Sequence, residues 1–167
     1  MDTNEDLYEC EENTYGQAIS ERGLELIASF EGYSSQAYYC PAGVLTIGFG
    51  HTGTNAHGEP LQETDTVTRE QAMELLYQDL AMAEATVNEQ DLELTQDQFD
   101  ALVSFVYNVG SSAFEQSTML KLLKAGDYDG AAAQFARWNK IKGKVSAGLT
   151  ARRSVEQELF CGRSMES

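Results

Sequence analysis

The sequence lacks any apolar run of the roughly 18 residues that a membrane-spanning helix needs. Its first residues, MDTNEDLYECEENTYGQ, contain neither the basic nor the apolar region of a secretory signal peptide. We therefore expect no stable membrane insertion, and synthesis in the cytoplasm without an export signal of the chain's own. Prolines are few, at 2 in 167 residues, and 42% of the residues are hydrophobic, which is typical of one compact globular domain.

Positive charge is also scarce, because 27 acidic residues stand against 11 lysines and arginines, giving a net charge of −16. This balance excludes a free-standing nucleic-acid-binding protein, which needs a dominant basic surface. The sign reverses in one segment that holds six basic residues and no acid, namely Arg137, Lys140, Lys142, Lys144, Arg152 and Arg153. Two interpretations of this segment stay open: a surface for an anionic polymer, or a solvated face that balances nearby acids.

Cysteine is limited to Cys10, Cys40 and Cys161. These residues have neither the CxxC spacing nor the histidine partners of a metal cluster. At most one intramolecular disulfide can form among them, and the sequence does not choose between the three pairings. If Cys40 took part in that bond, thiol–disulfide exchange would control its availability.

Capping patterns and apolar periodicity predict a mainly helical chain. Ser20 is a suitable N-cap for a helix that ends near Glu31, and Thr68 with Gln71 forms a capping box that opens another helix. A second capping box opens the helix TQDQFDALVSFVYNVG at residues 95–110. Further helices are expected in STMLKLLKAG, DYDGAAAQFARWN and TARRSVEQELF, with a turn at GKVSAG. The Pro/Gly turn between AYYC and VLTIGF predicts a β-hairpin.

Five residues around this predicted hairpin suggest a reactive site. Partial burial of Glu31 on the apolar face of its helix would favour the protonated carboxyl that a general acid requires. Cys40 and Thr46 fall on the two arms of the hairpin, where each could contact a water molecule opposite the acid. Gly48 and Gly50 lack side chains, which would let a bulky polymer approach the backbone.

The order Glu, eight residues, Cys, five residues, Thr resembles the catalytic pattern of phage-type lysozymes, glycoside hydrolase family 24. The resemblance continues through TIGFGH and TQDQFDALVSFVYNVG and covers about residues 20–160. It closes on a set of matching positions: Trp138, Gly148, Leu149, Arg152, Arg153 and Glu156.

The resemblance implies an α+β, mainly helical, bilobed fold. A small β-hairpin lobe would be joined by a long helix, at residues 68–90, to a larger helical lobe, with the active site between the lobes. The expected organisation is an acidic, partly disordered leader at residues 1–19, a single lysozyme-like catalytic domain at residues 20–162 and a frayed C-terminus at residues 163–167.

The resemblance also implies an endolysin, an N-acetylmuramidase that cleaves the β-1,4 bond between N-acetylmuramic acid and N-acetylglucosamine and so lyses bacteria without a cofactor or metal. Glu31 would donate a proton to the glycosidic oxygen, Cys40 would be the second catalytic group and Thr46 would help to hold the attacking water.

Other residues receive supporting roles. Asn108 is either a sugar contact or a helix-end cap, and both roles stay open. We expect Gly48 and Arg137 to contact the substrate, with Arg137 holding anionic wall polymer. His51, beside the glycine-rich strand, is expected to be a structural support rather than a proton-transfer group.

Two other functions remain open at this level: a non-catalytic peptidoglycan-binding module, which the thiol at Cys40 favours, and a lytic transglycosylase, for which a single acid suffices. In each case peptidoglycan is the expected partner. We expect a monomer that acts in the periplasm or cell wall after release by a holin or a secretion carrier.

Overall fold

The computed structural model describes residues 16–162. Most of the expected leader, including Cys10, and the expected frayed end at residues 163–167 lie outside the described residues. The chain divides into two compact units, one formed by residues 20–82 and the other by residues 83–162 together with residues 16–19.

The first unit begins with α2 (Glu21–Glu31). The hydroxyl of Ser20 accepts a hydrogen bond from the Gly23 N–H at 3.0 Å, which confirms the predicted N-cap. The helix ends at Gly32, whose φ of +76° is a conformation that glycine adopts without strain. This end leaves Glu31 as the last residue of the helix.

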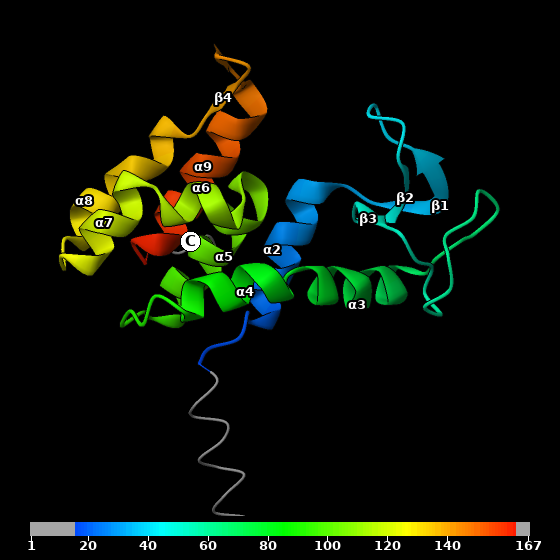
Figure 1. The fold of residues 1–167 in the computed structure, drawn as a ribbon, viewed down its shortest axis with the longest axis horizontal. Helices are drawn as coiled ribbons and strands as arrows, with labels where there is room; N and C mark the ends of the chain where they lie inside the picture. The colour runs from blue at the N-terminus through cyan, green and yellow to red at the C-terminus, as the bar shows by residue number, and fades with distance from the viewer. Residues whose placement is uncertain (1–15, 163–167) are drawn as a thin grey trace, which may run out of the picture. The chain divides into compact units, whose positions relative to one another are not determined.

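The predicted hairpin is confirmed and is extended by a third strand. β1 (Ser34–Tyr39), β2 (Leu45–Gly48) and β3 (His51–Thr52) form an antiparallel sheet in that order. The β2 strand also contacts α3 (Arg69–Asp79) (Figure 1). The sheet and two helices therefore form one small packed unit.

The helix expected over residues 68–90 is divided into α3 and α4 (Ala81–Asn88). The capping box of Thr68 and Gln71 opens α3 as predicted. Leu80 separates the two helices, with φ −80° and ψ −8°, and its N–H points to the carbonyls of both Leu76 and Tyr77. No proline or glycine stands at this point, so the sequence carried no sign of the interruption.

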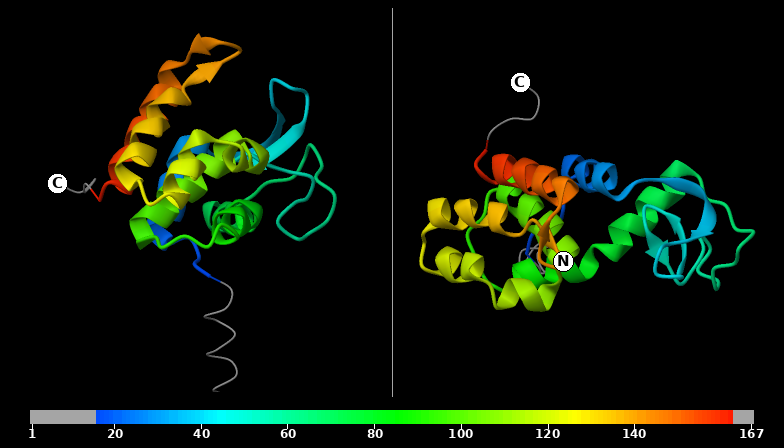
Figure 2. Two further views of the ribbon diagram at one scale, coloured as in Figure 1. Left: turned by 60° about the vertical axis from the view of Figure 1, so that its left-hand side comes forward. Right: turned by 90° about the horizontal axis from the view of Figure 1, so that it is seen from above.

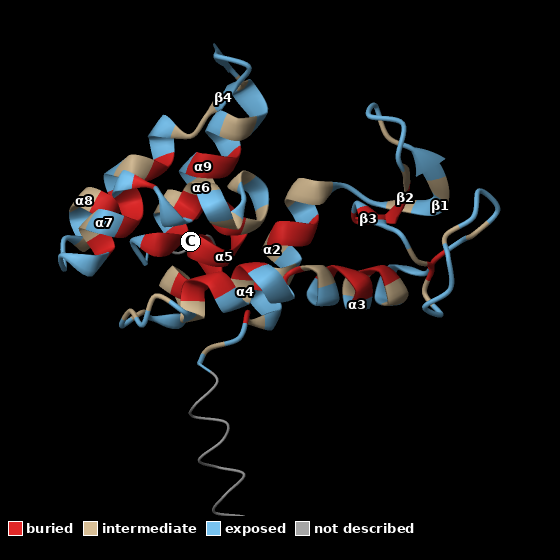
Figure 3. Ribbon diagram, viewed as in Figure 1, coloured by how far each residue is buried: buried red, intermediate tan, exposed pale blue. Residues whose placement is uncertain are grey.

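The second unit is built around α5 (Gln96–Val109), which packs against α9 (Ala147–Phe160). The capping box at Thr95 and Gln98 is present, and most of α5 is buried (Figure 3). The remaining helical elements surround this pair and are α6 (Ser111–Glu115), α7 (Thr118–Lys124), α8 (Tyr128–Gln134) and the 3₁₀ helix η1 (Phe135–Arg137).

A short hairpin replaces the turn expected at GKVSAG. β4 (Lys140–Ile141) and β5 (Lys144–Val145) pair antiparallel and precede α9 (Figure 2). Lys142 and Gly143 both have positive φ, at +51° and +81°, as the tightest two-residue hairpin turns require. A strand of two residues is too short to show the alternation of polar and apolar side chains that identifies a strand in a sequence. The sequence therefore predicted only the turn.

A buried ionic cluster joins α5 to α9. The Glu156 carboxylate accepts a hydrogen bond from Arg152 Nε at 3.1 Å and another from the Ser104 hydroxyl, and its other oxygen lies 2.9 Å from Arg153 Nε. Both arginines are buried, so neither interpretation of the basic segment applies to them. Only its first part, from Arg137 to Lys144, presents exposed cations.

We predict that Glu156→Gln lowers the free energy of unfolding by about 3 kcal/mol, because two buried guanidinium groups would lose their compensating charge. Glu158→Gln, an exposed change of the same kind on the same helix, should leave stability almost unchanged. Urea unfolding followed by circular dichroism measures both. Equal stability of the two variants would contradict a structural role for the cluster.

Candidate active site

Glu31 lies beside a glycine that places no side chain against its carboxyl group. The side chain is half-buried at the end of α2. A methyl group built on the exposed Gly50 would stand 3.8 Å from Glu31 Oε1, in ordinary van der Waals contact. The absence of a side chain at Gly50 therefore keeps space open next to this carboxyl.

Gly48 is packed against a helix, whereas Gly50 lies beside Glu31. It is buried, and a methyl group built there would lie 3.0 Å from the Cβ of Ala72 on α3. With φ at +67° as well, this position allows β2 to pack closely on the helix. The structure thus gives Gly48 a packing contact, whereas Gly50 is the glycine that borders Glu31.

The hairpin brings Cys40 and Thr46 together. The Cys40 N–H donates to the Val44 carbonyl at 3.0 Å, and the Gly43 N–H donates to the Cys40 carbonyl at 2.8 Å, which closes the turn. Tyr38 lies directly opposite Thr46. Because side chains alternate along a strand, Cys40 projects to the same face as Tyr38 and therefore to that of Thr46.

The turn around Cys40 favours the thiolate. The pKa of the Cys40 thiol is lowered, first by hydrogen bonding with the backbone at Val44 and then at Ala42, with smaller help from the Thr46 hydroxyl and Gly43. Partial burial opposes this shift without reversing it. The Thr46 hydroxyl, which donates to the Val44 carbonyl at 2.8 Å, has one hydrogen and can turn it to the sulfur instead.

His51 is engaged at both ring nitrogens. Nδ1 lies 2.9 and 3.0 Å from the two carboxylate oxygens of Asp79, and Nε2 lies 2.9 Å from the Thr54 hydroxyl. The ring is buried and links β3 to the last residue of α3. Both ring nitrogens are therefore occupied by contacts with Asp79 and Thr54.

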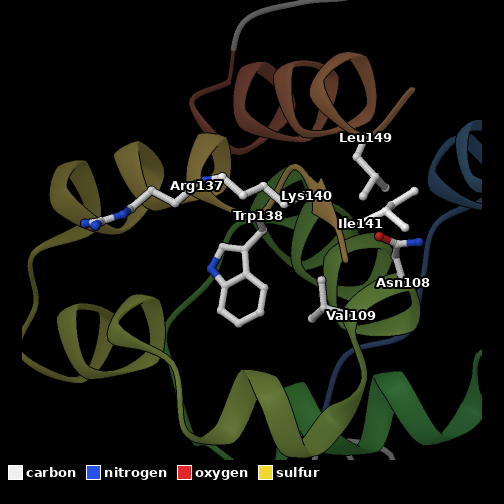
Figure 4. Close-up of a pocket in the computed structure, with 7 residues that line it drawn as sticks. All are labelled: Asn108, Val109, Arg137, Trp138, Lys140, Ile141 and Leu149. Atoms are coloured by element: carbon white, nitrogen blue, oxygen red, sulfur yellow. The ribbon is translucent and has the colours of Figure 1, made fainter. Parts of the chain in front are cut away.

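Asn108 and Arg137 belong to the second unit, where both line a hollow of about 480 Å³. Figure 4 shows its lining residues, which also include Val109, Trp138, Lys140, Ile141 and Leu149. The Asn108 Oδ1 accepts a hydrogen bond from Arg153 Nη2 at 2.6 Å, which ties the end of α5 to α9. The sequence did not predict the contact between Arg153 and Asn108. Arg153 stood out there only as one position of the family pattern, because no local signal shows which arginine will be buried.

Other kinds of site find no support within residues 16–162. That range contains no group of three histidine, cysteine or acidic side chains arranged to hold a metal ion. Its helices are also too short or too polar to cross a bilayer. Cys40 and Cys161 are both free thiols, so the disulfide between these two is absent, whereas any pairing with Cys10 lies outside the described residues.

Comparisons with known proteins find related sequences over most of this chain. A family model described as phage lysozyme matches residues 28–156. The endolysin of Acyrthosiphon pisum secondary endosymbiont phage 1 is 46% identical over 147 residues, which are 85% of this chain and 97% of that protein. The endolysin of Bacillus phage B103 is 43% identical over 145 residues, and there the chain spans about half, 53%, of the relative's length.

A solved structure confirms the predicted fold class. The crystal structure of a P22 lysozyme mutant matches with a TM-score of 0.82 at 35% identity, covering 87% of this chain and 99% of that one. The chain therefore has the α+β, mainly helical fold of lysozymes.

We predict that alkylation of Cys40 by iodoacetamide reaches half its maximal rate at a lower pH than alkylation of a model peptide thiol. The lowered pKa means that the reactive thiolate is already populated at a pH where an ordinary thiol is still protonated. The measurement uses a variant carrying Cys10→Ser and Cys161→Ser, so that mass spectrometry reports Cys40 alone. A titration curve at or above that of the model peptide would contradict the role of the turn.

Proposed function

Because this chain belongs to the phage lysozyme family and is a peptidoglycan-hydrolysing muramidase, we propose that Glu31, Cys40 and Thr46 carry its reaction. The observation that supports this assignment is their place in one compact unit, with open space beside the Glu31 carboxyl and hydrogen bonds that favour the Cys40 thiolate. Each group then has a distinct task.

Glu31 acts as the general acid. Its proton passes to the glycosidic oxygen as the bond from C1 of N-acetylmuramic acid breaks, and the N-acetylglucosamine side leaves as an alcohol. A water molecule supplies the new C1–O bond on the opposite face of the sugar, so the anomeric configuration inverts. The products differ from the substrate by one added water.

Cys40 and Thr46 align and activate that water. A thiolate is the form that can accept a proton, and the hydrogen bonds of the turn favour this form. Thr46 is buried, and its hydroxyl lies close enough to Cys40 to bridge the thiol and the water. A thiolate thus takes the place that a carboxylate has in inverting glycosidases.

The setting of the reaction follows from the substrate. We propose a monomer made in the cytoplasm that reaches the periplasm or cell wall through a holin lesion or on a secretion carrier, and that meets peptidoglycan rather than nucleic acid. The excess of negative charge supports the exclusion of nucleic acid. Lysis by purified protein only after membrane permeabilisation would support the need for a delivery partner.

We predict that Glu31→Gln lowers the rate of peptidoglycan cleavage by about 10²- to 10⁴-fold, because the amide has the size of the acid but no proton to donate. Glu21→Gln, an exposed change in the first turn of the same helix, should keep the full rate. Mass spectrometry of the released muropeptides distinguishes hydrated products from the anhydro-sugars of a transglycosylase. Wild-type activity in Glu31→Gln would contradict the assignment.

We predict that Cys40→Ser reduces the rate by about 10²-fold, because a hydroxyl does not ionise near neutral pH, whereas Cys40→Asp retains activity. In the wild type, activity should fall as the pH drops through the lowered pKa of Cys40, because the thiolate is lost there. In Cys40→Asp this fall should move towards the ordinary aspartate pKa, about 3.9. Cys161→Ser serves as the control, and an unchanged pH profile in Cys40→Asp would show that the thiol is not the base.

A further inference from the structure

Two glycines border the Glu31 carboxyl in the first unit. Gly32 follows Glu31 directly and ends α2, and a methyl group built on Gly50, in the turn between β2 and β3, would stand 3.8 Å from Glu31 Oε1. Both glycines have positive φ, at +76° and +82°. A glycine has no side chain that could anchor it, so its place depends on the residues beside it. Those residues are aromatic in both cases, since Tyr33 follows Gly32 and Phe49 precedes Gly50.

The two aromatic rings contact each other. The centres of the Tyr33 and Phe49 rings lie 5.2 Å apart, with an angle of 44° between the ring planes. Phe49 is buried, whereas Tyr33 is exposed. An aromatic pair at this distance is stabilised beyond the burial of its apolar area. The contact therefore joins the chain segment that follows Glu31 to the turn that lies beside the Glu31 carboxyl.

Tyr33 is also held at its hydroxyl group. This hydroxyl donates a hydrogen bond to the Val67 carbonyl at 3.1 Å. The Val67 N–H in turn donates to the carbonyl of Ser35 in β1 at 2.9 Å, so the acceptor is itself bonded to the sheet. The Tyr33 side chain is therefore restrained at two points, by Phe49 at the ring and by Val67 at the hydroxyl.

Phe49 has a further contact with the helices. The guanidinium carbon of Arg69, the first residue of α3, lies over the Phe49 ring at 5.6 Å from its centre. Arg69 Nη2 also lies 3.2 Å from the carboxylate of Glu25 on α2. Both side chains of this ion pair are exposed, so the pair adds little stability, and the aromatic contact is the main restraint on Phe49. These contacts nevertheless return to α2, the helix that ends at Glu31.

The other end of the turn is held independently. Gly50 is followed by His51, whose ring nitrogens contact Asp79 and Thr54. The turn that carries Gly50 thus has two supports, His51 on one side and Phe49 on the other. Of these two, Phe49 is the one whose ring contacts the segment that follows Glu31.

We propose that Phe49 is a positioning residue for the general acid, because its contact with Tyr33 sets the separation between the Glu31 carboxyl and the Gly50 backbone. This inference rests on the proposed function in taking Glu31 to be the proton donor. A reacting group displaced by about 1 Å can lose about 10²-fold in rate. Such a displacement weakens an interaction that is made in the transition state, so the loss falls on kcat while KM changes little.

Phe49→Leu tests the ring, because leucine keeps an apolar side chain but removes the aromatic contact with Tyr33. We expect kcat for the cleavage of soluble peptidoglycan fragments to fall about 10- to 100-fold, and KM to change by less than about twofold.

Phe160→Leu is the matched control. Phe160 is buried as well and meets the ring of Phe135 at a tilted angle, with the centres 5.6 Å apart, but it belongs to the second unit. This variant should lower the melting temperature by an amount comparable to Phe49→Leu and leave kcat unchanged. An equal fall of kcat in both variants would show that loss of aromatic packing anywhere in the chain has this effect, and would contradict a specific role of Phe49.

A double-mutant cycle separates positioning from a general loss of structure. If Phe49 acts through the Glu31 carboxyl, Phe49→Leu has little left to disturb once that carboxyl is an amide. We therefore expect Phe49→Leu to change the residual rate of Glu31→Gln by less than about twofold, as measured by mass spectrometry at a raised enzyme concentration. Equal fold losses in the two backgrounds would show a structural role and overturn the inference.

Tyr33 provides a second pair of variants at an exposed position, where a substitution is less damaging to the fold than at Phe49. Tyr33→Leu removes the ring and should lower kcat as Phe49→Leu does. Tyr33→Phe keeps the ring, loses only the bond to Val67 and should retain most of the rate. Equal losses in the two variants would assign the effect to the hydroxyl rather than to the aromatic pair and contradict the proposal.

The same cycle distinguishes a failure of this inference from a failure of the proposed function. Full activity in Glu31→Gln would overturn the proposed function, and with it a role of Phe49 that depends on the acid. A strong loss in Glu31→Gln together with the wild-type kcat in Phe49→Leu would overturn only the inference about Phe49. A loss in Phe49→Leu that disappears in the Glu31→Gln background would support both.

Discussion

The second unit depends on one buried carboxylate, that of Glu156, which lies between two buried arginines and offsets part of their positive charge. Burial raises the pKa of Glu156, and the charges of Arg153 and Arg152 oppose that rise. Without its carboxylate, α9 would press two uncompensated cations against α5, at a cost of several kcal/mol. Because the cluster also fixes Arg153, it connects the stability of the helical unit to the orientation of Asn108 at the surface.

In the first unit the candidate reactive residues are held mainly by backbone geometry rather than by buried charged side chains. Its reactive thiol obtains a lowered pKa from the peptide groups of a tight turn, which remain in place whatever side chains surround them. Gly48 and Gly50 differ in their surroundings, since Gly48 packs against α3 and Gly50 leaves space beside Glu31. The contact between His51 and Asp79 then ties the short third strand to α3.

Local signals in the sequence predicted the parts of this fold that local chemistry determines. The caps at Ser20, Thr68 and Thr95 and the hairpin between β1 and β2 are each specified by a few adjacent residues. The spacing of Glu31, Cys40 and Thr46 identified the family, and the structure adds the contact between the last two. The interruption at Leu80 and the strands β4 and β5 depend on tertiary packing or on segments too short to show a period, so no sequence pattern indicated them.

The basic segment shows that counting charged residues in a sequence does not reveal which of them are buried. Six cations in succession suggested one surface, yet the structure divides them by depth, with Arg152 and Arg153 inside and Arg137 to Lys144 outside. An exposed cation in a chain of net charge −16 is partly screened by its own protein, so its pull on a distant polyanion is weak. For a group in direct contact with the protein, the sign of the nearest charges matters more than the net charge of the chain. Arg137 and Lys140 therefore make the lining of the hollow beside Trp138 locally positive, although the chain as a whole is strongly acidic.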